Sequence, residues 1–368
     1  MPKAKETVLE IDLGALAQNF NYLKSKLKTD TKVLAVIKAF AYGSDSVEIA
    51  KQLQHLKVNY FAVAYTHEGV VLRNAGITTP ILVLHPQTTN FDTIIDRCLE
   101  PSLYSTKILN EFIQVAEKKN QSAYPVHIKF NTGLNRLGFW QNEVDDVVSK
   151  LKTSKSVIAK TIFSHLAASE AINEKKFTTQ QINCFKAIAK EFETKIGYKP
   201  WLHLCNTSGV INYPEAHFDM VRCGIGLYGF GNSAQEDKNL KPIATLKSII
   251  SQIHNVDKNE TVGYNRAFKA NSLVKTATIP IGHADGITRI YGNEKGFVYI
   301  NDKKAPIIGN VCMDMIMVNV TGIDCKEGDE VIIFNTKYNA SQLAESANTI
   351  SYEIITSISQ RVRRLFIK

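Results

Sequence analysis

The chain has 368 residues, of which 44% are hydrophobic and 21% charged, as in an ordinary folded globular protein. Its formal net charge of +9 is spread along the sequence, and the one compact basic run, 361–368, is mixed with apolar residues as in a terminal strand or helix. Nucleic-acid binding needs a clustered basic face with stacking aromatics and is disfavoured, although the excess charge could attract anionic substrates or phosphate.

Up to about residue 230, short apolar segments alternate with amphipathic helical stretches, which include 46–55, 106–118 and 179–195. Eight predicted strands, each followed by helix or turn signals, fit an α/β fold of the (β/α)8 TIM-barrel type. We therefore predict a cofactor-binding barrel over residues 10–240. The predicted strands are 33–37, 59–65, 80–85, 100–104, 125–130, 158–163, 200–205 and 218–223.

After about residue 240 the segments become short and alternating, with turn residues at Asn301-Asp302 and Gly328-Asp329. This texture predicts a mainly antiparallel β domain over residues 241–368, which residues 1–9 could join. The predicted elements are strands 246–253, 275–281, 296–300, 305–311 and 330–334 and a closing helix near 340–347.

The six cysteines show neither a CxxC pair nor a repeated spacing, and most lie in apolar runs, so we expect buried free thiols. The first residues lack the apolar core of a signal peptide, and no apolar run approaches ~18 residues. We therefore expect a cytoplasmic protein in a reducing compartment, with no membrane or nucleic-acid partner.

Lys38 stands at the exit of the predicted buried strand 33–37, four residues before Tyr42. The low-dielectric edge of the protein disfavours the ammonium form of such a lysine, and a partly desolvated amine suits Schiff-base chemistry. On this evidence alone, a lysine that merely extends to solvent at a strand end is an open alternative.

In a barrel of this kind, catalytic groups lie at the carboxyl-terminal ends of the strands. At least five of the eight predicted strands end in Lys, Arg or His, which packing alone does not readily explain. We therefore predict that the barrel mouth holds an anion. The side chains at or just beyond these strand ends are Lys38, Lys129, Arg136, His165, His203 and Arg222.

The turn Gly224-Ile225-Gly226 follows the eighth predicted strand, where barrels of this type commonly bind phosphate through free backbone N–H groups. Thr207 and Ser208, on the preceding loop, could add hydroxyl donors. A desolvated amine beside a phosphate site indicates pyridoxal phosphate. The histidines are too dispersed for a metal motif, so no metal is predicted.

Eight motifs occur in order along the chain: AVIKAFAYG (35–43), HIKFNTGLNRLG (127–138), FSHLA (163–167), VRCGIGLYG (221–229), VGY (262–264), IPIGHADG (279–286), GNVCMD (309–314) and ISYE (350–353). Together they resemble the pyridoxal-phosphate-dependent, barrel-type alanine racemases over nearly the whole chain. The ordered set is far more specific than any one motif.

The resemblance implies interconversion of L- and D-alanine by two-base proton transfer on a pyridoxal phosphate aldimine, which supplies D-alanine for peptidoglycan. Lys38 would hold the cofactor and act on one face of the substrate, and Tyr264 of a second subunit would act on the other, in a homodimer with shared active sites. A tyrosine with a pKa near ~10 is a poor base, so nearby cations must lower that pKa, and His165 and Arg222 are the candidates.

The resemblance also implies binding roles. Arg222 would face the pyridine nitrogen and, because a guanidinium does not readily release a proton, leave that nitrogen unprotonated. Arg136 and Met313 would bind the substrate, and Lys129 is a candidate for carbamylation. The implied cofactor-binding residues are Lys38, Tyr42, His165, Asn206, Thr207, Ser208, Arg222, Gly224, Ile225 and Tyr352.

Several positions depart from the usual pattern of this family, and they leave the substrate size open. A broader-specificity amino-acid racemase of the same fold is therefore the alternative. Related decarboxylases, and small cofactor-carrying proteins without turnover, are disfavoured because their characteristic motifs are missing and because a β domain is predicted here. Without the resemblance, Tyr264 and Tyr352 could be core residues. The departures are Phe40 for asparagine, Ser44-Asp45 for His-Gly, Asn131 for aspartate, Asn135 for glycine and His283 for a gate tyrosine.

Overall fold

The computed structural model describes residues 5–367, which divide into two compact units. The larger unit contains residues 17–41 and 46–240. The smaller unit contains the described residues up to Leu16, the segment Tyr42–Asp45, and the residues from Lys241 onward. Lys38 and Tyr42, only four residues apart, therefore belong to different units.

The larger unit is built on a closed barrel of eight parallel strands that follow one another in sequence order. Each predicted strand has its counterpart, so the predicted barrel is confirmed. Apolar runs such as Val33–Val36 are buried along their whole length, as expected of a strand covered on both faces. The strands are β2 (Lys32–Val36), β3 (Tyr60–Val63), β4 (Ile81–Val83), β5 (Glu100–Leu103), β6 (Tyr124–Lys129), β7 (Val157–Phe163), β8 (Trp201–His203) and β9 (Met220–Cys223).

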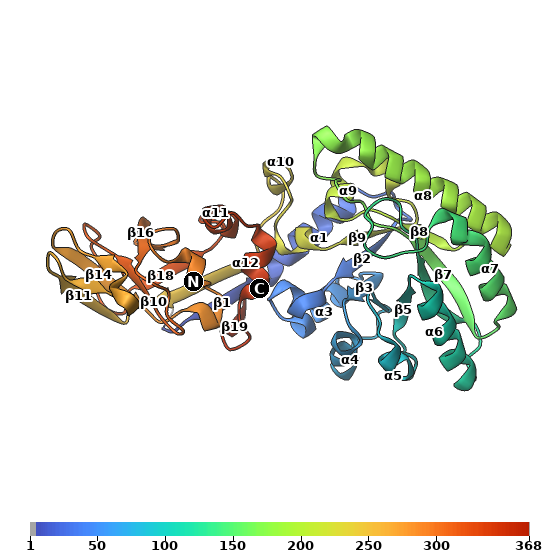
Figure 1. The fold of residues 1–368 in the computed structure, drawn as a ribbon, viewed down its shortest axis with the longest axis horizontal. Coiled ribbons are helices and arrows are strands. Elements are labelled where there is room, and N and C mark those ends of the chain that lie inside the picture. Colours follow the sequence, from blue (N-terminus) through green and yellow to red (C-terminus); the bar gives the residue numbers. More distant parts are fainter. Residues whose placement is uncertain (1–4, 368) are drawn as a thin grey trace. The chain divides into compact units, whose positions relative to one another are not determined.

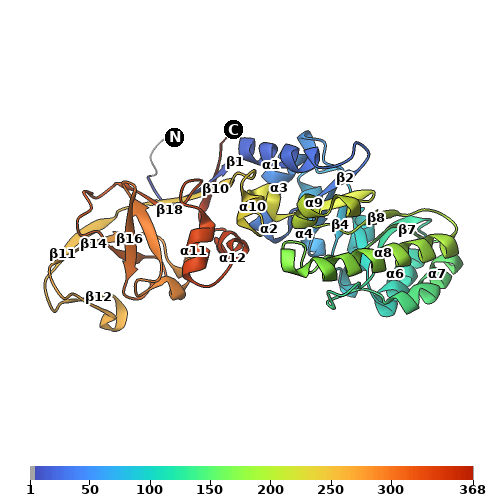
Figure 2. The same ribbon diagram turned by 90° about the horizontal axis from the view of Figure 1, so that it is seen from above.

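Helices surround the barrel strands (Figures 1 and 2). The predicted helices at 46–55 and 106–118 have the expected bounds, and the third begins four residues earlier than predicted, at Lys175. That helix ends where Gly197 takes a left-handed conformation (φ 87°). The helices are α1 (Leu13–Ser25), α3 (Ser46–His55), α4 (Thr66–Asn74), α5 (Phe91–Asp96), α6 (Thr106–Lys118), α7 (Val144–Thr153), α8 (Lys175–Ile196), α9 (Thr207–Asn212) and α10 (Ala234–Asp237).

The smaller unit is a nine-stranded sheet in the order β11-β14-β17-β16-β15-β18-β10-β1-β19, in which only the β1–β19 pair is parallel. Its first strand comes from the start of the chain, and the basic run at the end of the chain forms β19. The strands are β1 (Val8–Asp12), β10 (Ala244–Ile249), β11 (Gln252–Val256), β14 (Val274–Ile279), β15 (Phe297–Ile300), β16 (Lys303–Ile308), β17 (Ile316–Asn319), β18 (Glu330–Phe334) and β19 (Arg363–Ile367).

The remaining elements of this unit are the short pair β12 (Thr261–Val262) and β13 (Phe268–Lys269) and the helices α11 (Ala340–Ser346) and α12 (Ser351–Ser357). The single strand predicted at 246–253 was wrong. The chain changes partner there, because the Ile250 amide donates to Asp329 and the next amide, that of Ser251, donates to Thr278. Two strands, β10 and β11, result. Strand β17 and helix α12 were not predicted.

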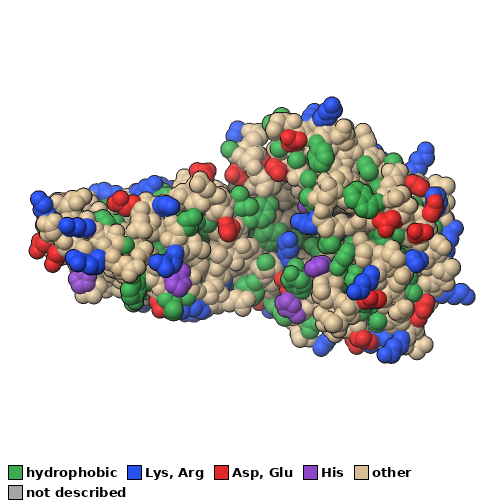
Figure 3. Space-filling view, in the orientation of Figure 1, with side chains coloured by type: hydrophobic (Ala, Val, Ile, Leu, Met, Phe, Trp, Pro, Cys, Tyr) green, Lys and Arg blue, Asp and Glu red, His purple; other side chains and the backbone are tan. Residues whose placement is uncertain are grey.

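The six cysteines are all free thiols, but the expectation that they are buried holds only in part. Cys205, Cys223 and Cys325 are buried, Cys184 and Cys312 are partly exposed, and Cys98 is exposed. On the face of the molecule shown in Figure 3, Lys and Arg side chains alternate with acidic ones and form no single basic patch. Within residues 5–367, no helix combines the length and apolar character that crossing a membrane requires.

Candidate active site at the barrel mouth

Lys38 opens a turn of left-handed helix. After β2, the residues Ala39, Phe40, Ala41 and Tyr42 have φ angles of 53°, 55°, 50° and 52°. None of them is glycine, and each left-handed residue costs roughly 1–2 kcal/mol. Such strain persists only where the surroundings hold it, and it gathers at functional sites. The turn therefore marks Lys38 as a position of special backbone geometry.

Glu68, which the sequence did not single out, holds the start of this turn. Its carboxylate accepts hydrogen bonds from the amides of Ala39 (2.6 Å), Ala64 (2.7 Å) and Tyr65 (3.0 Å). Burial and the charge of Arg136 lower the pKa of Lys38, while Glu68 acts in the opposite direction. The only sequence signal for Glu68 was an acidic residue in the first turn of α4, directly after a predicted strand.

Arg222, on β9, is buried with 4% of its surface exposed, and it joins three strand ends. Its Nη1 donates to Nδ1 of His203 (2.7 Å), and its Nη2 donates to the carbonyl oxygens of Ser164 (2.7 Å) and Leu204 (2.8 Å). The same Nη2 lies 3.1 Å from Nδ1 of His165. A guanidinium held by this many partners has a fixed plane.

Cationic groups converge around Arg222. Burial, Arg136, Arg222 and Lys38 lower the pKa of Lys129 to about 8. Burial and the same group of cations hold the pKa of His165 well below its ordinary value. Burial also lowers the pKa of Arg222 to about 10. Mutual repulsion of this kind is relieved by an anion, so the described geometry has the electrostatics of an anion site.

The turn after β9 packs against Thr207. The amides of Gly224 and Gly226 donate to Thr207 Oγ1 over 3.2 and 3.3 Å. A Cβ on Gly226 would lie 2.6 Å from Thr207 Cγ2, so only glycine fits there. Asn206 caps α9 by accepting from the Gly209 amide (2.9 Å). The predicted phosphate residues Asn206, Thr207, Gly224 and Ile225 are therefore adjacent, but the expectation of free N–H groups is wrong for Gly224 and Gly226, whose amides already donate to Thr207.

Ser208 differs from its neighbours in the use of its hydroxyl. That hydroxyl donates to Oε2 of Glu236 (3.0 Å) and accepts from Nδ2 of Asn232 (2.7 Å). Glu236 is buried and also accepts from Asn212 Nδ2 (2.8 Å). The Ser208 hydroxyl proton is thus already engaged within the protein. Sequence reasoning missed Glu236, which carried no motif.

The loop that carries Arg136 is held by two residues that depart from the family pattern. The Asn131 side chain accepts from the amides of Gly133 (3.1 Å) and Asn135 (3.0 Å) and donates to the Asn135 side chain (2.9 Å). Asn135 is left-handed (φ 56°), a conformation that asparagine tolerates. The departures at these positions therefore preserve a tight loop, and Arg136 itself is exposed.

Tyr42 and Tyr352 lie together in the smaller unit, with ring centroids 6.0 Å apart. Burial and Tyr352 raise the pKa of the Tyr42 phenol, which is 7% exposed. Arg364 secures the adjoining turn by donating to the carbonyl oxygens of Gly43 (2.8 Å) and Ser44 (3.2 Å).

Tyr264 and Met313 are also in the smaller unit, and both are exposed there, Tyr264 by 71% and Met313 by 59%. The alternative that Tyr264 is a core residue is therefore wrong. The loops around Met313 are tied together, because the His283 amide donates to Cys312 (2.9 Å) and the Ala284 amide donates to Met313 (3.0 Å).

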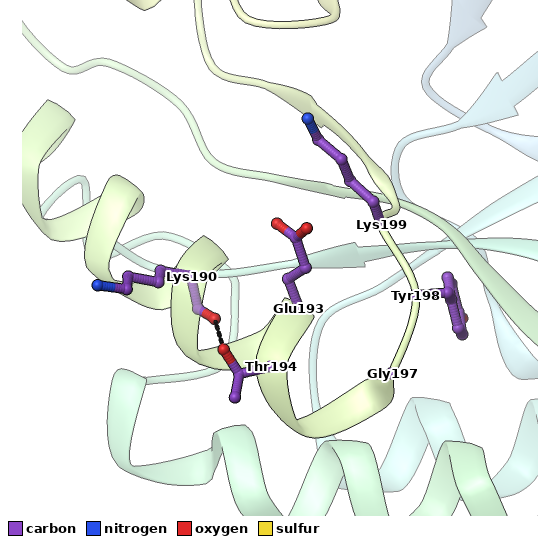
Figure 4. Close-up of a pocket in the computed structure, with 6 residues that line it drawn as sticks. All are labelled: Lys190, Glu193, Thr194, Gly197, Tyr198 and Lys199. Atoms are coloured by element: carbon purple, nitrogen blue, oxygen red, sulfur yellow. Dashed lines mark hydrogen bonds between the residues drawn. The ribbon is translucent and has the colours of Figure 1, made fainter.

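A hollow of about 490 Å³ lies away from this site, between the last turns of α8 and the segment that leads into β8 (Figure 4). Its lining is Lys190, Glu193, Thr194, Gly197, Tyr198 and Lys199. Because it is at the amino-terminal end of β8, it is not part of the barrel mouth. The described part of the chain contains no group of three His, Cys, Asp or Glu residues placed to hold a metal ion.

Comparison with known proteins gives the same family at every level. Residues 11–231 match the family model "Alanine racemase, N-terminal domain", and residues 243–366 match "Alanine racemase, C-terminal domain". The chain is 37% identical to "Alanine racemase 1" of Clostridium acetobutylicum over 98% of this chain and 95% of that protein. It is 33% identical to an alanine racemase of Methanococcus maripaludis, over 97% and 98%.

Solved structures agree. An alanine racemase of Clostridium difficile superposes with a TM-score of 0.92 at 33% identity, covering 100% of this chain and 97% of that one. The Bacillus anthracis alanine racemase with bound L-Ala-P superposes with a TM-score of 0.91 at 29% identity, over 100% and 96%.

Proposed function

Because the chain belongs to the alanine racemase family, whose cofactor is pyridoxal phosphate, we propose that it interconverts L- and D-alanine with a two-base mechanism. The observation that carries the proposal is the grouping of Lys38 with Lys129, Arg136, His165 and Arg222, in which burial and neighbouring cations lower the pKa values of Lys38, Lys129 and His165. A phosphorylated, anionic cofactor offsets that repulsion, and the donor set fits it.

When bound, the cofactor supplies an electron sink that makes the α-proton of the substrate removable. Lys38 would hold it through its amine, and its lowered pKa favours the neutral form that both binds covalently and accepts a proton. The left-handed turn fixes the direction in which this amine leaves the strand.

Tyr264 is proposed as the second acid-base group, on the opposite face of the substrate. Its side chain is exposed in the smaller unit, so it is available to a site outside that unit. The proposed assembly is a homodimer in which Tyr264 and Met313 of one subunit complete the site of the other. Arg222 is the cation proposed to act on the Tyr264 phenol, whereas His165, whose pKa is held well below its ordinary value, is neutral and does not fill the cationic role expected of it.

Arg222 is proposed to face the pyridine nitrogen. Four polar partners fix its plane, and a guanidinium keeps its protons, so a ring nitrogen beside it stays unprotonated. Arg222 would thereby weaken the bound cofactor as an electron sink, which would disfavour side reactions.

The other binding roles follow the family. The phosphate is assigned to Tyr42, Asn206, Thr207, Ser208, Gly224, Ile225 and Tyr352, with Ser208 acting through its backbone because its hydroxyl is engaged by Glu236. Arg136 and Met313 are assigned to the substrate carboxylate. Lys129, with a pKa of about 8, holds enough neutral amine near pH 7 to react with CO2, and Arg136 would balance the carbamate charge.

We further propose a cytoplasmic enzyme whose D-alanine supplies peptidoglycan, and two domains that divide near residue 240. A broader-specificity amino-acid racemase is the second candidate, because Phe40 and His283 depart from the family pattern and His283 is exposed.

The test uses the purified, cofactor-loaded protein and a panel of D- and L-amino acids, with loss of optical rotation as the readout. Alanine is expected to racemise fastest, and comparable rates with larger side chains would favour the second candidate. Lys38→Ala should remove the long-wavelength absorption of bound cofactor, whereas the exposed-lysine control Lys51→Ala should keep it.

Tyr264→Phe should suppress α-proton exchange in D2O from one enantiomer of alanine far more than from the other. The control Tyr338→Phe removes a phenol of the same unit that is bonded to Asp302 and should change neither rate. Equal loss from both enantiomers would contradict the two-base assignment.

A further inference from the structure

A chain of polar side chains runs through the interior of the barrel from Arg222 to Glu100. Arg222 Nη1 lies 2.7 Å from His203 Nδ1, and His203 Nε2 lies 2.9 Å from Thr161 Oγ1. Thr161 Oγ1 is 2.8 Å from His127 Nδ1, and His127 Nε2 is 2.8 Å from Glu100 Oε2. We call these five residues the core chain. Each comes from a different strand, from β9 through β8, β7 and β6 to β5.

The two ends of the core chain impose the same hydrogen-bond direction. A guanidinium only donates, so His203 Nδ1 accepts and His203 Nε2 carries the proton that goes to Thr161. A carboxylate only accepts, so His127 Nε2 donates to Glu100, and in a neutral ring His127 Nδ1 accepts the Thr161 hydroxyl proton. Every bond then points from Arg222 toward Glu100, and bonds aligned in this way polarise one another.

The core chain is buried and its rings are held in place. His127, Thr161 and His203 are each 0% exposed. The His203 ring stacks on Phe163 with centroids 4.6 Å apart and an interplanar angle of 5°. Tyr60 meets the His127 ring edge-on at 5.9 Å. Neither ring can turn over without breaking bonds on both of its sides.

Glu100 is the first residue of β5 and lies at the amino-terminal rim of the barrel, whereas the racemase site is at the other rim. It also accepts from Tyr60 (2.9 Å) and pairs with Lys160 (3.2 Å). Although burial acts to raise it, the pKa of Glu100 is held below its ordinary value by His127, Lys160 and Tyr60. The acceptor end of the core chain is therefore an ionised carboxylate.

We propose that Glu100 and His127 are positioning residues for the racemase, which act on the guanidinium of Arg222 through Thr161 and His203. They keep a neutral, polarised acceptor against Nη1, and so fix the orientation in which Arg222 meets the cofactor. The inference rests on the proposed function of Arg222. It extends the set of residues that serve the site to the opposite end of the barrel. The competing explanation is that the core chain only stabilises the interior of the barrel.

Thr161→Val is the most specific way to break the core chain, because valine has the shape of threonine without the hydroxyl. Thr161→Ser restores the hydroxyl. The matched control is Ser102→Ala: Ser102 pairs in register with His127, is 0% exposed, and its hydroxyl has no hydrogen-bond partner among residues 5–367. The control therefore removes a buried hydroxyl from the same region and leaves the core chain intact. Glu100→Gln tests the far end.

The first readout needs no cofactor. In protein labelled with 15N-histidine and freed of cofactor, the rings of His127 and His203 should both be neutral with the proton on Nε2. Thr161→Val and Glu100→Gln should shift the His203 nitrogen signals, Thr161→Ser should return them, and Ser102→Ala should leave them in place. A doubly protonated His127, or His203 signals that Thr161→Val and Glu100→Gln leave unmoved, would overturn the proposal.

The second readout is kinetic. With cofactor bound, Thr161→Val should lower kcat for alanine about tenfold, equivalent to ~1.4 kcal/mol of activation free energy, with KM within about threefold. Thr161→Ser should recover most of the loss, and an equal loss in Ser102→Ala would assign the effect to packing. If the wild-type protein does not racemise alanine, the proposed function fails, while the nitrogen spectra still decide whether the core chain acts on His203.

Discussion

Arg222 and His203 are joined by a 2.7 Å hydrogen bond in which Nδ1 of the histidine must accept, because a guanidinium has no lone pair to offer. Burial and the charge of Arg222 hold the pKa of His203 well below its ordinary value of 6.5. His203 is therefore neutral in the folded protein at pH 6.5 and above.

Acid should destabilise the protein from about pH 6.5 downward. In that range His203 binds a proton in the unfolded chain but stays unprotonated in the folded protein, so the free energy of unfolding falls as the pH falls. One such histidine contributes up to about 1.4 kcal/mol per pH unit. His203→Gln keeps an acceptor for Arg222 and a donor for Thr161 but cannot titrate, and it should flatten the decline.

Urea unfolding of both proteins at pH 5 and pH 7 measures this difference. His55→Gln, at an exposed position on α3, is the control and should retain the wild-type slope. A slope in His203→Gln that matches the wild type would contradict the assignment of acid sensitivity to this ring.

Lys129 should make the free energy of unfolding depend on pH in a second range, at alkaline pH. Its pKa is about 8 in the folded protein against 10.5 ordinarily, so between these values the unfolded chain holds a proton that the folded protein has lost. The free energy of unfolding should then rise from pH 8 to pH 10.5, by about 3 kcal/mol at most. Lys129→Met should reduce this rise in cofactor-free protein.

Urea unfolding at pH 7.5, 9 and 10 checks this, with CO2 excluded so that carbamylation does not intervene. Lys118→Met, at an exposed position on α6, is the control and should leave the rise unchanged. If the free energy of unfolding of Lys129→Met rises as much as that of the wild type, other groups cause the rise at alkaline pH.

The barrel was predictable because eight buried strands with intervening helices leave a repeated apolar signal, and strand ends then bring Lys38, Lys129, His165 and Arg222 to one rim. What the sequence could not show were partners chosen by three-dimensional packing. Glu68, which accepts the Ala39 amide, is 29 residues distant from it in the sequence. Nothing about its local pattern distinguished it from any other helix-capping acid.

The backbone at Phe40 was equally hidden, because a left-handed turn of non-glycine residues has no compositional signature. This backbone conformation shows what is special about phenylalanine at position 40. Asparagine, which the resemblance leads us to expect at this position, is among the residues that tolerate positive φ, whereas a bulky aromatic is not. Phe40 therefore carries backbone strain that an asparagine would reduce.

Phe40→Asn is expected to relieve part of that strain. With φ at 55°, the gain should be about 0.5–1 kcal/mol in the free energy of unfolding, measured by urea titration. Ala41→Asn tests the neighbouring position, but Ala41 is fully buried, so the amide group should cost more than the backbone gains. If Phe40→Asn is instead destabilising by more than 1 kcal/mol, the contacts of the aromatic ring outweigh the strain.

Arg361 should control substrate affinity through the Met313 loop. Its Nε donates to Asp285 (2.6 Å) and its Nη2 to Asp314 (2.6 Å), and Asp285 also accepts from the Gly282 amide (2.8 Å). Arg361 thus ties the segment Gly282–Asp285, which includes His283, to the segment that carries Met313. Arg361→Met should loosen both.

Since Met313 is proposed to contact the substrate carboxylate, the expected result of Arg361→Met is a rise in KM for alanine on the order of threefold to tenfold, with kcat changed less. The matched control is Arg363→Met, whose arginine pairs at 3.1 Å with Glu6 between side chains that are 67% and 59% exposed and should contribute little. Steady-state kinetics with L-alanine and with D-alanine measure the changes in KM and kcat separately. A fall in kcat alone, or equal effects of the two substitutions, would mean that Arg361 does not act through the Met313 loop.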